Sequence, residues 1–496
     1  MTRQQVVIVI LAVLVIIFGA STAYLIAFPP TAPPVTVTKT IAATVTKTVT
    51  TTETVTMTAP PTTIVTTMPP TTTVTTSVTT SVMTPTAPVA KEIHQWDGLT
   101  GGDGVVFDEI VWKFGNATGI KVVRTTLYWN DLYARVSATY KAGGELPPVL
   151  LMHTSEVPLY AGTVFEPLDD LVKELGITKD MFLETAWEGC IWNGKLYCLP
   201  WDVHLFAIYF RVDLAKQYDI PVPPPACKAY GLKCWDKPIR DRNDYLEWLR
   251  LAKEKLPPDI APAGWTPGDL NNFWAFYGFL ESDPFVGSGT EQDPKPDFTS
   301  PDAMEAFKLH QIMYEEGLGK VFTWNDLASC LCNGKAFTWY NGPWMQTTFD
   351  RLEECPYGVI PVFSKAGTWG NSHVIALTKS AFKDPETLEA VKLYLKYLYT
   401  AESNGYWGMH AGHVPVFKAA LESYKSFSIH RAMFAAQAFD FGFRYLPRHP
   451  LIVQVGDILA NELGALLAGQ KTAEDAAKST QEQVMEALEA FRAAKS

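Results

Sequence analysis

Three segments of the chain carry side chains that suit a polyhydroxylated ligand. Each follows a predicted strand, and they read Trp96-Asp97-Gly98, Tyr128-Trp129-Asn130 and His153-Thr154-Ser155-Glu156. Aromatic rings cover the apolar face of a sugar, while hydroxyl, amide and carboxylate groups bind its hydroxyls. Because ligands lie at the carboxyl ends of strands in open α/β sheets, these segments are candidates for one shared site.

Alternating strands and helices must position these side chains. Short apolar runs predict strands at residues 93–96, 120–128 and 147–152. Residues 98–104 are interpreted as a loop, the helix after it is expected to end near Gly119, and Asn130 is expected to cap the next helix. Strand–helix alternation predicts a parallel sheet covered by helices.

Turn and cap signals mark the later elements. Asn193-Gly194 predicts the turn of a hairpin within residues 190–204. Ser300-Pro301 and Thr472 predict helix starts, from a proline at the first helical position and from a capping box. These signals extend the α/β pattern to the end of the chain.

Size and charge exclude some classes of protein. About 400 residues follow residue 90, which exceeds one ordinary hydrophobic core and predicts two lobes. The net charge of −11 argues against a nucleic-acid partner. The glycine-rich residues 98–104 lack the spacing and the lysine of a phosphate-binding loop, and we expect no cofactor. The 15 tryptophans, several in predicted loops, favour stacking on a ligand.

Cysteine spacing predicts disulfides. Cys227 and Cys234 flank a short loop and are the best candidate pair, and Cys190 and Cys198 flank the predicted hairpin turn as a second pair. Both disulfides can form if this part of the chain lies outside the cell, where the environment is oxidising.

The remaining cysteines leave the connectivity open. One of Cys330 and Cys332 is expected to join Cys355, and the odd total of 7 leaves at least one free or intermolecular thiol. A zinc site is the alternative, but the chain has no CxxC pair and no histidines at ligand spacing, so no metal site is predicted.

The start of the chain predicts a membrane anchor. Residues 6–28 carry no charge, and Arg3 is the only basic residue before them. At a rise of about 1.5 Å per residue such a helix spans a hydrocarbon core of about 30 Å, with its short end in the cytoplasm. A cleaved signal peptide is the alternative, because Ser21-Thr22-Ala23 offers small residues at a cleavage position.

Residues 29–90 predict a stalk. Thr, Pro and Val dominate this tract, and repeated proline pairs interrupt the Val-Thr alternation. Such tracts form extended, O-glycosylated stalks, which reach up to roughly 190 Å at about 3.1 Å per residue. Disorder without glycans is the alternative. Asn116-Ala117-Thr118 adds an N-glycan acceptor sequence, so the chain is expected to be a glycoprotein.

Several further stretches follow one another in the order and at the spacing of a known protein family. They include Phe114 with Gly119-Ile120-Lys121-Val122, Asn193-Gly194-Lys195-Leu196, Asn341-Gly342-Pro343-Trp344, His413-Val414-Pro415 and residues 96–104, 144–149, 165–170, 298–302 and 333–337. Together they resemble the family 1 extracellular solute-binding proteins, the sugar receptors of ABC importers, which include maltose-binding protein. The resemblance covers about residues 92–494, and Pro147-Pro148 departs from the family pattern at a position that is mainly structural.

This resemblance implies an α/β fold with two lobes of the periplasmic-binding-protein type (type II), each a mainly parallel sheet flanked by helices. Crossover strands are expected at residues 200–204 and 363–373. The solute-binding head is predicted at 91–496. Lobe one is expected at about 92–202 with a return near 370–410, and lobe two at about 205–362 with the C-terminal helices.

The resemblance also implies a ligand in the cleft between the lobes. The expected ligand-binding residues are Trp96, Asp97, Thr100, Gly101, Thr154, Ser155, Glu156, Trp201, Asp202, Trp339, Asn341, Trp344, Trp369, Asn371 and His410. Core packing is the alternative for Trp96 and Trp344, capping of the following loop is the alternative for Asp97, and a hinge hydrogen bond is the alternative for Asp202. His373 and His410 are expected to be structural more often than ligand contacts.

The implied function is capture of a sugar by a non-enzymatic, monomeric head at the extracellular side of the cell membrane. The implied partners are an ABC permease and a separate ATPase chain, because this sequence has no Walker motif. An extracellular glycoside hydrolase is one alternative, and it requires two carboxylates about 5 to 9.5 Å apart. A surface carbohydrate adhesin is the other.

Overall fold

The computed structural model describes residues 88–266, 270–352, 355–362 and 367–494, which belong to one compact unit, Val78–Ser496. The predicted anchor at 6–28 lies outside the described residues, and so does the predicted stalk apart from residues 88–90. Within the described ranges, no helix combines the length and the hydropathy needed to cross a bilayer.

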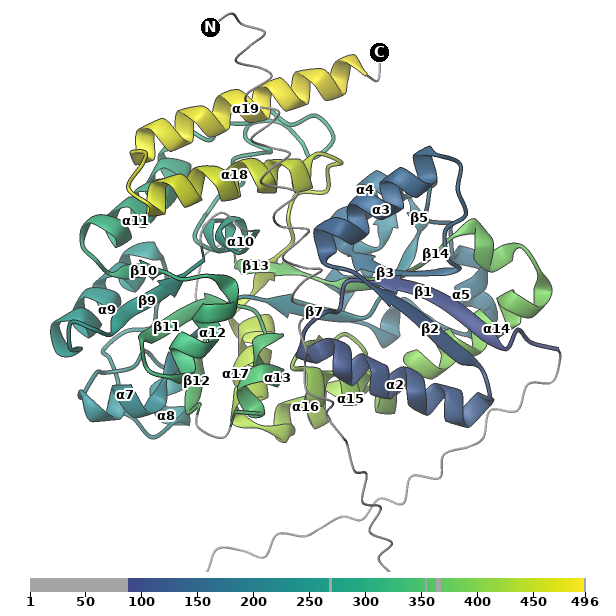
Figure 1. The fold of residues 1–496 in the computed structure, drawn as a ribbon, viewed down its shortest axis with the longest axis horizontal. Coiled ribbons are helices and arrows are strands. Elements are labelled where there is room, and N and C mark those ends of the chain that lie inside the picture. The colour runs from purple at the N-terminus through teal and green to yellow at the C-terminus, as the bar shows by residue number, and fades with distance from the viewer. Residues whose placement is uncertain (1–87, 267–269, 353–354, 363–366, 495–496) are drawn as a thin grey trace, which may run out of the picture. The chain divides into compact units, whose positions relative to one another are not determined.

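The first sheet has the strand order β2-β1-β3-β14-β6 and forms the centre of lobe one (Figure 1). Its strands are β1 (Glu92–Asp97), β2 (Lys121–Thr126), β3 (Val149–His153), β6 (Cys198–Pro200) and β14 (His373–Leu377). β1 pairs in parallel with β2 and β3, whereas β14 runs antiparallel to β3 and β6. All of β3 is buried, as an apolar strand covered on both faces must be.

Helices cover this sheet where the apolar spacing predicts them. They are α2 (Gly102–Thr118), α3 (Trp129–Lys141), α14 (Pro385–Leu398) and α15 (Ala401–Ala411). α2 ends at Gly119, whose φ of 77° is a left-handed conformation that glycine adopts without strain, which confirms the predicted end.

Two predictions at helix starts are wrong. Residues 98–104 are not all loop, because α2 begins at Gly102. Asn130 does not cap α3, since the extended residue before that helix is Tyr128. In neither case does a side chain cap the helix, so the usual signal for the start is missing from the sequence.

The second sheet forms the centre of lobe two, with the order β10-β9-β11-β8-β12. Its strands are β8 (Ala207–Arg211), β9 (Ala261–Trp265), β10 (Gly319–Val321), β11 (Ala336–Asn341) and β12 (Tyr357–Ile360). The surrounding helices include α9 (Arg242–Lys255), α10 (Leu270–Gly278), α11 (Pro301–Glu315), α18 (Ile452–Leu467) and α19 (Ala473–Ala493). Ser300 and Thr472 accept hydrogen bonds from the first turns of α11 and α19, which confirms both predicted starts.

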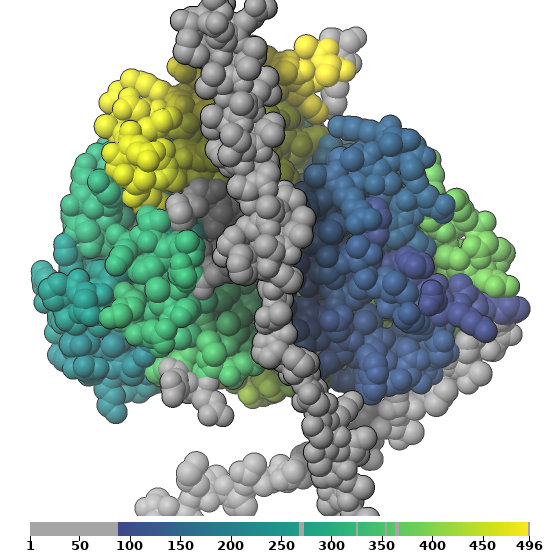
Figure 2. Space-filling model, in the orientation of Figure 1, coloured from purple at the N-terminus to yellow at the C-terminus, as the bar shows by residue number. Residues whose placement is uncertain are grey.

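A third sheet connects the lobes, with the order β15-β7-β13-β16. It contains β7 (Asp202–Leu205), β13 (Thr368–Asn371), β15 (Val414–Pro415) and β16 (Phe443–Arg444). β7 runs from β6 of lobe one to β8 of lobe two, and β13 returns antiparallel to it toward β14. The fold therefore has two α/β lobes joined by crossing strands, as the sequence predicts, and Figure 2 shows α18 and α19 in yellow on lobe two.

Short elements complete the chain. They are η1 (Thr154–Glu156), α4 (Val157–Tyr160), α5 (Asp169–Leu175), η2 (Lys179–Met181), α6 (Glu184–Gly189), β4 (Ile191–Trp192), β5 (Lys195–Leu196), α7 (Val212–Gln217), α8 (Ala226–Ala229), α12 (Trp324–Cys332), α13 (Met345–Asp350), η3 (Lys379–Phe382), η4 (Lys418–Ala420), α16 (Leu421–Phe427), α17 (Ile429–Ala436) and η5 (Gln437–Phe441). β4 and β5 form the predicted hairpin, with Asn193 and Gly194 at positive φ in its turn.

The disulfide Cys227–Cys234 confirms the best predicted pair, and Cys332 bonds Cys355. The predicted Cys190–Cys198 bond is wrong, because both residues are buried thiols. The backbone N–H of Tyr197 donates to the carbonyl of Cys190, so the register of the hairpin places Tyr197, and not Cys198, opposite Cys190.

Candidate functional site

A cavity of about 600 Å³ lies between the lobes. Lobe one, lobe two and the crossing strands all contribute to its lining. The described lining residues are Gly98, Thr100, Gly101, Gly102, Asp103, Tyr128, Trp129, His153, His204, Trp274, Ala328, Trp344, Met345, Thr348, Trp369, His373 and His413. A ligand in this cavity would therefore contact both lobes at once.

Three indoles form one side of the cavity, and we call Trp274, Trp344 and Trp369 the tryptophan wall. The rings of Trp274 and Trp369 stack with centroids 4.6 Å apart and planes 14° apart. Trp344 stands across them, with centroids 6.0 Å from Trp274 and 6.5 Å from Trp369. Its ring lies over Gly342, where a Cβ would come within 2.1 Å of it. The wall is thus fixed by ring packing and by one glycine.

The wall also offers an unused donor. Trp369 is 1% exposed, and its Nε1 has no hydrogen-bond partner among the described residues. Buried polar groups are normally hydrogen-bonded, and an unpaired one costs about 1–3 kcal/mol. A polar ligand in the cavity would supply the missing acceptor.

The loop after β1 and the first turn of α2 line the same cavity as the wall. Thr100 and Gly101 are exposed there, and Asp103 lies in the first turn of α2. Gly98 has a steric role, because a Cβ at this position would lie 2.2 Å from the ring of Trp129. This glycine lets Trp129 pack against the loop and complete the lobe-one side of the cavity.

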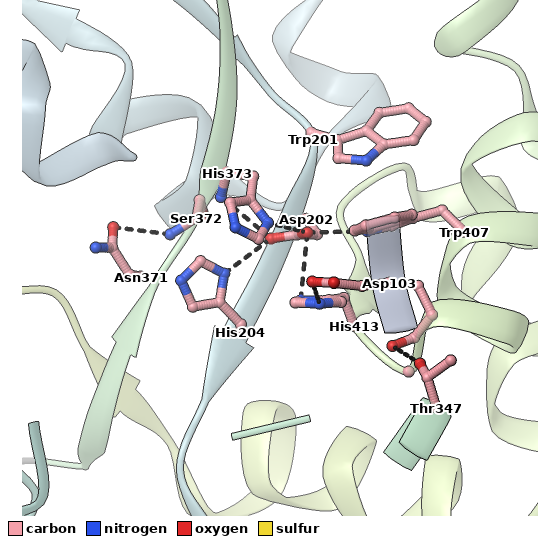
Figure 3. A network of polar contacts seen from close by, with 12 residues as sticks. Asp103, Trp201, Asp202, His204, Thr347, Asn371, Ser372, His373, Trp407 and His413 are labelled. Atoms are coloured by element: carbon pink, nitrogen blue, oxygen red, sulfur yellow. Dashed lines mark hydrogen bonds and ion pairs between the residues drawn. The ribbon is translucent and has the colours of Figure 1, made fainter. Parts of the chain in front are cut away.

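Three histidines, His204, His373 and His413, contact the buried carboxylate of Asp202, and the ring of His153 packs on those of His204 and His373. We call His153, His204, His373 and His413, with Asp202, the histidine floor. Figure 3 shows His204, His373 and His413 directed at Asp202 from different segments of the chain. The N–H groups at Nδ1 of His204 and His373 donate to Asp202 over 3.1 and 2.7 Å.

Further donors complete the surroundings of Asp202. The indole Nε1 of Trp407 donates to Oδ2 over 2.9 Å, and the backbone N–H of His373 donates to Oδ1 over 3.1 Å. Nδ1 of His413 lies 3.4 Å from Oδ2 of Asp202, and its Nε2 lies 3.4 Å from Oδ2 of Asp103. Asp202 is the centre of this network.

Burial and neighbouring groups shift the titration of the floor. Burial raises the pKa of Asp202, but the nearby His373 and His413 and the hydrogen bonds from His204 and His373 lower it well below its ordinary value. Burial and the neighbouring His373 lower the pKa of His204 to about 3. Burial also lowers the pKa of His153 well below its ordinary value. The carboxylate of Asp202 is therefore ionised at pH 7, and His153 and His204 are neutral.

Four of the predicted ligand-binding residues line the cavity. They are Thr100, Gly101, Trp344 and Trp369. The others do not line it: Trp96, Asp97, Thr154, Ser155, Glu156, Trp201, Asp202, Trp339, Asn341, Asn371 and His410.

Some of these other residues have clear structural partners. Asp97 is fully buried and accepts two hydrogen bonds from the guanidinium of Arg124, over 2.6 and 2.8 Å. Trp201 is fully buried, with its ring edge-on to Phe107 and Tyr399. Both side chains stabilise lobe one.

The remaining positions divide among three places. Thr154 donates to Oδ1 of Asn371, and Nδ2 of Asn371 donates to Ser155, where η1 after β3 meets the end of β13. Trp339 and Asn341 are buried in β11, the guanidinium of Arg135 covers the ring of Trp96, and His410 packs on Tyr406 away from the cavity. Glu156 is buried, and burial raises its pKa to about 8.

The prediction of ligand residues missed much of the lining. Tyr128, Trp129 and His153 follow predicted strands, so a signal for them is present in the sequence. Trp274 has no comparable signal. The histidine floor depends on tertiary structure, since Asp202 and His373 are 171 residues apart.

Comparisons with known proteins agree with this architecture. The family model of the bacterial extracellular solute-binding proteins matches residues 109–434. A binding protein of Brucella abortus is 22% identical over 386 residues, which cover 74% of this chain and 86% of that protein. The sn-glycerol-3-phosphate-binding periplasmic protein UgpB of Escherichia coli is 23% identical, over 66% of this chain and 74% of that protein.

Solved structures share the fold at low sequence identity. The sugar-binding protein MalE of Xanthomonas citri has a TM-score of 0.65 at 15% identity, covering 81% of this chain and 98% of that chain. UgpB of Mycobacterium tuberculosis, in complex with glycerophosphocholine, has a TM-score of 0.67 at 15% identity, covering 81% and 99%. At these identities the likeness establishes the two-lobe fold alone.

Proposed function

This chain belongs to the bacterial extracellular solute-binding proteins, and we propose that it captures a neutral sugar or oligosaccharide for an ABC importer. One observation carries the proposal: the tryptophan wall and a polar loop line one cavity of about 600 Å³. Cavities of about 300–1,000 Å³ are typical for small-molecule ligands.

The two sides of the cavity match the two faces of a sugar. Indole rings bury the apolar C–H face at about 25 cal/mol per Å² of apolar area. The unpartnered Nε1 of Trp369, the hydroxyl of Thr100 and the carboxylate of Asp103 are suited to bind the hydroxyl groups.

The charge of the lining favours a neutral ligand. No lysine or arginine occurs among the described residues that line the cavity, and Asp103 contributes a carboxylate. A phosphate ester is bound best by arginine or lysine. The UgpB relatives bind sn-glycerol-3-phosphate by name, so a phosphate ester is the alternative ligand that must be tested beside the saccharides.

Capture proceeds by closure of the lobes around the ligand. We assign residues 92–202 with the return near 370–410 to lobe one, and 205–362 with the C-terminal helices to lobe two. The ligand contacts both lobes and so favours the closed state, while the crossing strands serve as the hinge.

The tether and the transport partners belong to the same proposal. Residues 6–28 anchor the chain in the cell membrane and residues 29–90 hold the head on the extracellular side. An ABC permease with a separate ATPase chain receives the ligand. Recovery of a peptide from residues 6–28 in the membrane fraction of the mature protein would support the anchor, and a mature N-terminus at Tyr24 would contradict it.

A glycoside hydrolase has less support. It needs two carboxylates on either side of the scissile bond. Asp103 is the only carboxylate among the described residues that line the cavity, and Asp202 is fully buried below the histidines. Release of reducing sugar from an oligosaccharide would nevertheless refute the proposal that the chain is a non-enzymatic receptor.

A thermal-shift screen of the full-length chain tests the ligand class. The panel contains maltose, maltotriose, tagatose, glycerol 3-phosphate and glycerophosphocholine. A ligand at 100 times its Kd stabilises the folded state by about 2.7 kcal/mol, so a binding saccharide raises the Tm by several degrees. A shift with the phosphate compounds and none with the saccharides would contradict the proposal.

A further inference from the structure

Three imidazoles and one carboxylate of the histidine floor form a compact donor set. One ligand atom from each of Asp202, His204, His373 and His413 lies within 4.8 Å of all the others. Asp202 and His204 belong to β7, His373 begins β14 and His413 precedes β15. The crossing strands and lobe one therefore bring these donors together.

We propose that these four residues bind a divalent transition-metal ion of the zinc type at the base of the cavity. Imidazole nitrogen and carboxylate oxygen are regular ligands of Zn²⁺, with bonds of about 2.0–2.2 Å, and four of them complete a tetrahedral shell. This inference does not depend on the bound solute being a sugar.

The spacing of the donors fits such a shell. Bonds of that length in a tetrahedron place neighbouring ligand atoms about 3.3 Å apart. The Nδ1 atoms of His204, His373 and His413 lie 3.1, 2.7 and 3.4 Å from oxygens of Asp202. The widest separation among the four ligand atoms is up to 4.8 Å, so the farthest pair must approach by up to about 1.5 Å to close a tetrahedral shell around the ion.

His413 supplies an independent observation. Its side chain is fully buried, and neither ring nitrogen makes a hydrogen bond among the described residues. Its nitrogens lie 3.4 Å from carboxylate oxygens of Asp202 and Asp103, at the long end for a hydrogen bond, so a partner that binds more closely can be accommodated. A metal ion is a partner that an imidazole nitrogen binds strongly.

Outer contacts hold the donors in place. Nε2 of His413 faces the carboxylate of Asp103 at 3.4 Å, which is the carboxylate–histidine arrangement common behind metal ligands. The ring of Trp407 stacks on His413 at 17° and its Nε1 donates to Asp202. The ring of Trp129 stacks on His373 at 16°. A metal bond at Nδ1 of His413 requires its ring proton on Nε2, where the carboxylate of Asp103 can accept it.

The position of the site defines its role. Four protein ligands fill a tetrahedral shell, as in structural zinc sites, so the ion would fix the crossing strands and not activate water. His204, His373 and His413 also line the cavity, which gives the ion a path from solvent. A purely structural network of hydrogen bonds to Asp202 is the alternative, and it binds no metal.

Titration of the chelator-treated full-length chain with Zn²⁺ tests the proposal. The expected result is one high-affinity ion per chain by calorimetry, with no binding of Mg²⁺ or Ca²⁺, which prefer oxygen ligands. Co²⁺ should give the intense visible absorption of a tetrahedral site with nitrogen ligands. An absence of stoichiometric Zn²⁺ binding, or a weak octahedral Co²⁺ spectrum, would overturn it.

Histidine variants locate the site. His373→Gln and His413→Gln should each weaken Zn²⁺ binding by at least about 100-fold, because loss of an outer-shell partner alone costs 10–100-fold. His310→Gln, at a buried histidine on α11, and His94→Gln, at an exposed one on β1, are matched controls that should bind normally. Loss of binding in His94→Gln with retention in His413→Gln would place the ion on the surface and refute the site.

If a floor variant fails to fold, the Co²⁺ spectrum of the unmutated chain still shows whether the protein has a tetrahedral metal site with nitrogen ligands. Saccharide binding is a separate readout: a chain that binds Zn²⁺ and no saccharide refutes the proposed function alone. A chain that binds a saccharide and no Zn²⁺ refutes the metal site alone.

Discussion

The tryptophan wall and the histidine floor line the same cavity, but they differ in how their polar atoms are used. In the wall, the indole faces contact one another and Nε1 of Trp369 has no hydrogen-bond partner among the described residues. In the floor, Asp202 accepts hydrogen bonds from His204, His373 and Trp407. The wall can therefore accept a ligand without losing existing bonds, whereas the floor must exchange bonds to accept anything. The difference supports the proposal that the wall binds the solute, and it predicts that the floor stabilises the fold.

Removal of the carboxylate at the centre of the floor should have the largest effect. Asp202→Ala leaves several buried donors without their acceptor, and removing one partner of a buried ionic network costs about 3–5 kcal/mol. We expect a loss of that size in the free energy of unfolding, measured by urea denaturation. Asp180→Ala, at an exposed aspartate, is the matched control. A loss below about 1 kcal/mol would mean that the floor does not support the fold.

The pH dependence of stability should reveal the titration of Glu156, a second buried carboxyl group. The folded-state pKa of Glu156 is about 8, above its ordinary value of 4.5, because of burial. Its protonated form is thus favoured by folding, so the stabilising contribution is complete below pH 4.5 and is lost as the pH rises toward 8 and through it. The loss approaches about 1.4 kcal/mol per pH unit within that window.

Glu156→Gln removes this titration and isolates its effect. The variant should gain stability relative to the unmutated chain as the pH rises from 5 to 8, by urea denaturation at each pH. Glu305→Gln, on the exposed side of α11, should track the unmutated chain. Parallel stability curves for Glu156→Gln and the unmutated chain would show that Glu156 is ionised at no cost.

Truncation of the wall should impair binding more than folding. Trp344 is only partly buried, and Trp344→Ala should weaken saccharide binding by tenfold or more, which is about 1.4 kcal/mol. Trp112→Ala removes an indole that is 66% exposed and outside the cavity, so its affinity should be unchanged. Calorimetric titration with the best saccharide of the panel measures both. Equal saccharide affinities in Trp344→Ala and Trp112→Ala would show that the tryptophan wall does not bind the ligand.

The smallest effect is expected in the loop opposite the wall. Thr100→Ala removes one hydroxyl at the exposed edge of the cavity. A hydrogen bond contributes about 0.5–1.5 kcal/mol, so the affinity should fall by about twofold to tenfold. Thr100→Ser, which keeps the hydroxyl, should restore most of it. A loss larger than that of Trp344→Ala would reverse the assignment of binding to the wall.

Several helices were predictable because their signals are local, whereas the crossing strands between two lobes were implied by the family resemblance. The apolar face of α2, the left-handed Gly119 and the caps at Ser300 and Thr472 are all readable over a few residues. The start of α3 was not, since no side chain caps it.

The site was only partly predictable because its members meet through tertiary structure. Trp344, Trp369, Trp201 and Asp97 were all predicted to bind the ligand, but only Trp344 and Trp369 line the cavity. The ring of Trp201 packs on Tyr399, and Asp97 pairs with Arg124. Residue type indicates what a side chain can do, whereas its position in the tertiary structure decides whether it lines the cavity.

Intrinsic fluorescence of the tryptophan wall tests the central claim most directly. The full-length chain is titrated with maltose, maltotriose and tagatose beside a variant that carries Trp274→Phe, Trp344→Phe and Trp369→Phe together. We expect a saturable spectral change in the unmutated chain and its loss in the variant. The claim is contradicted if no saccharide changes the spectrum, or if the variant retains the full change.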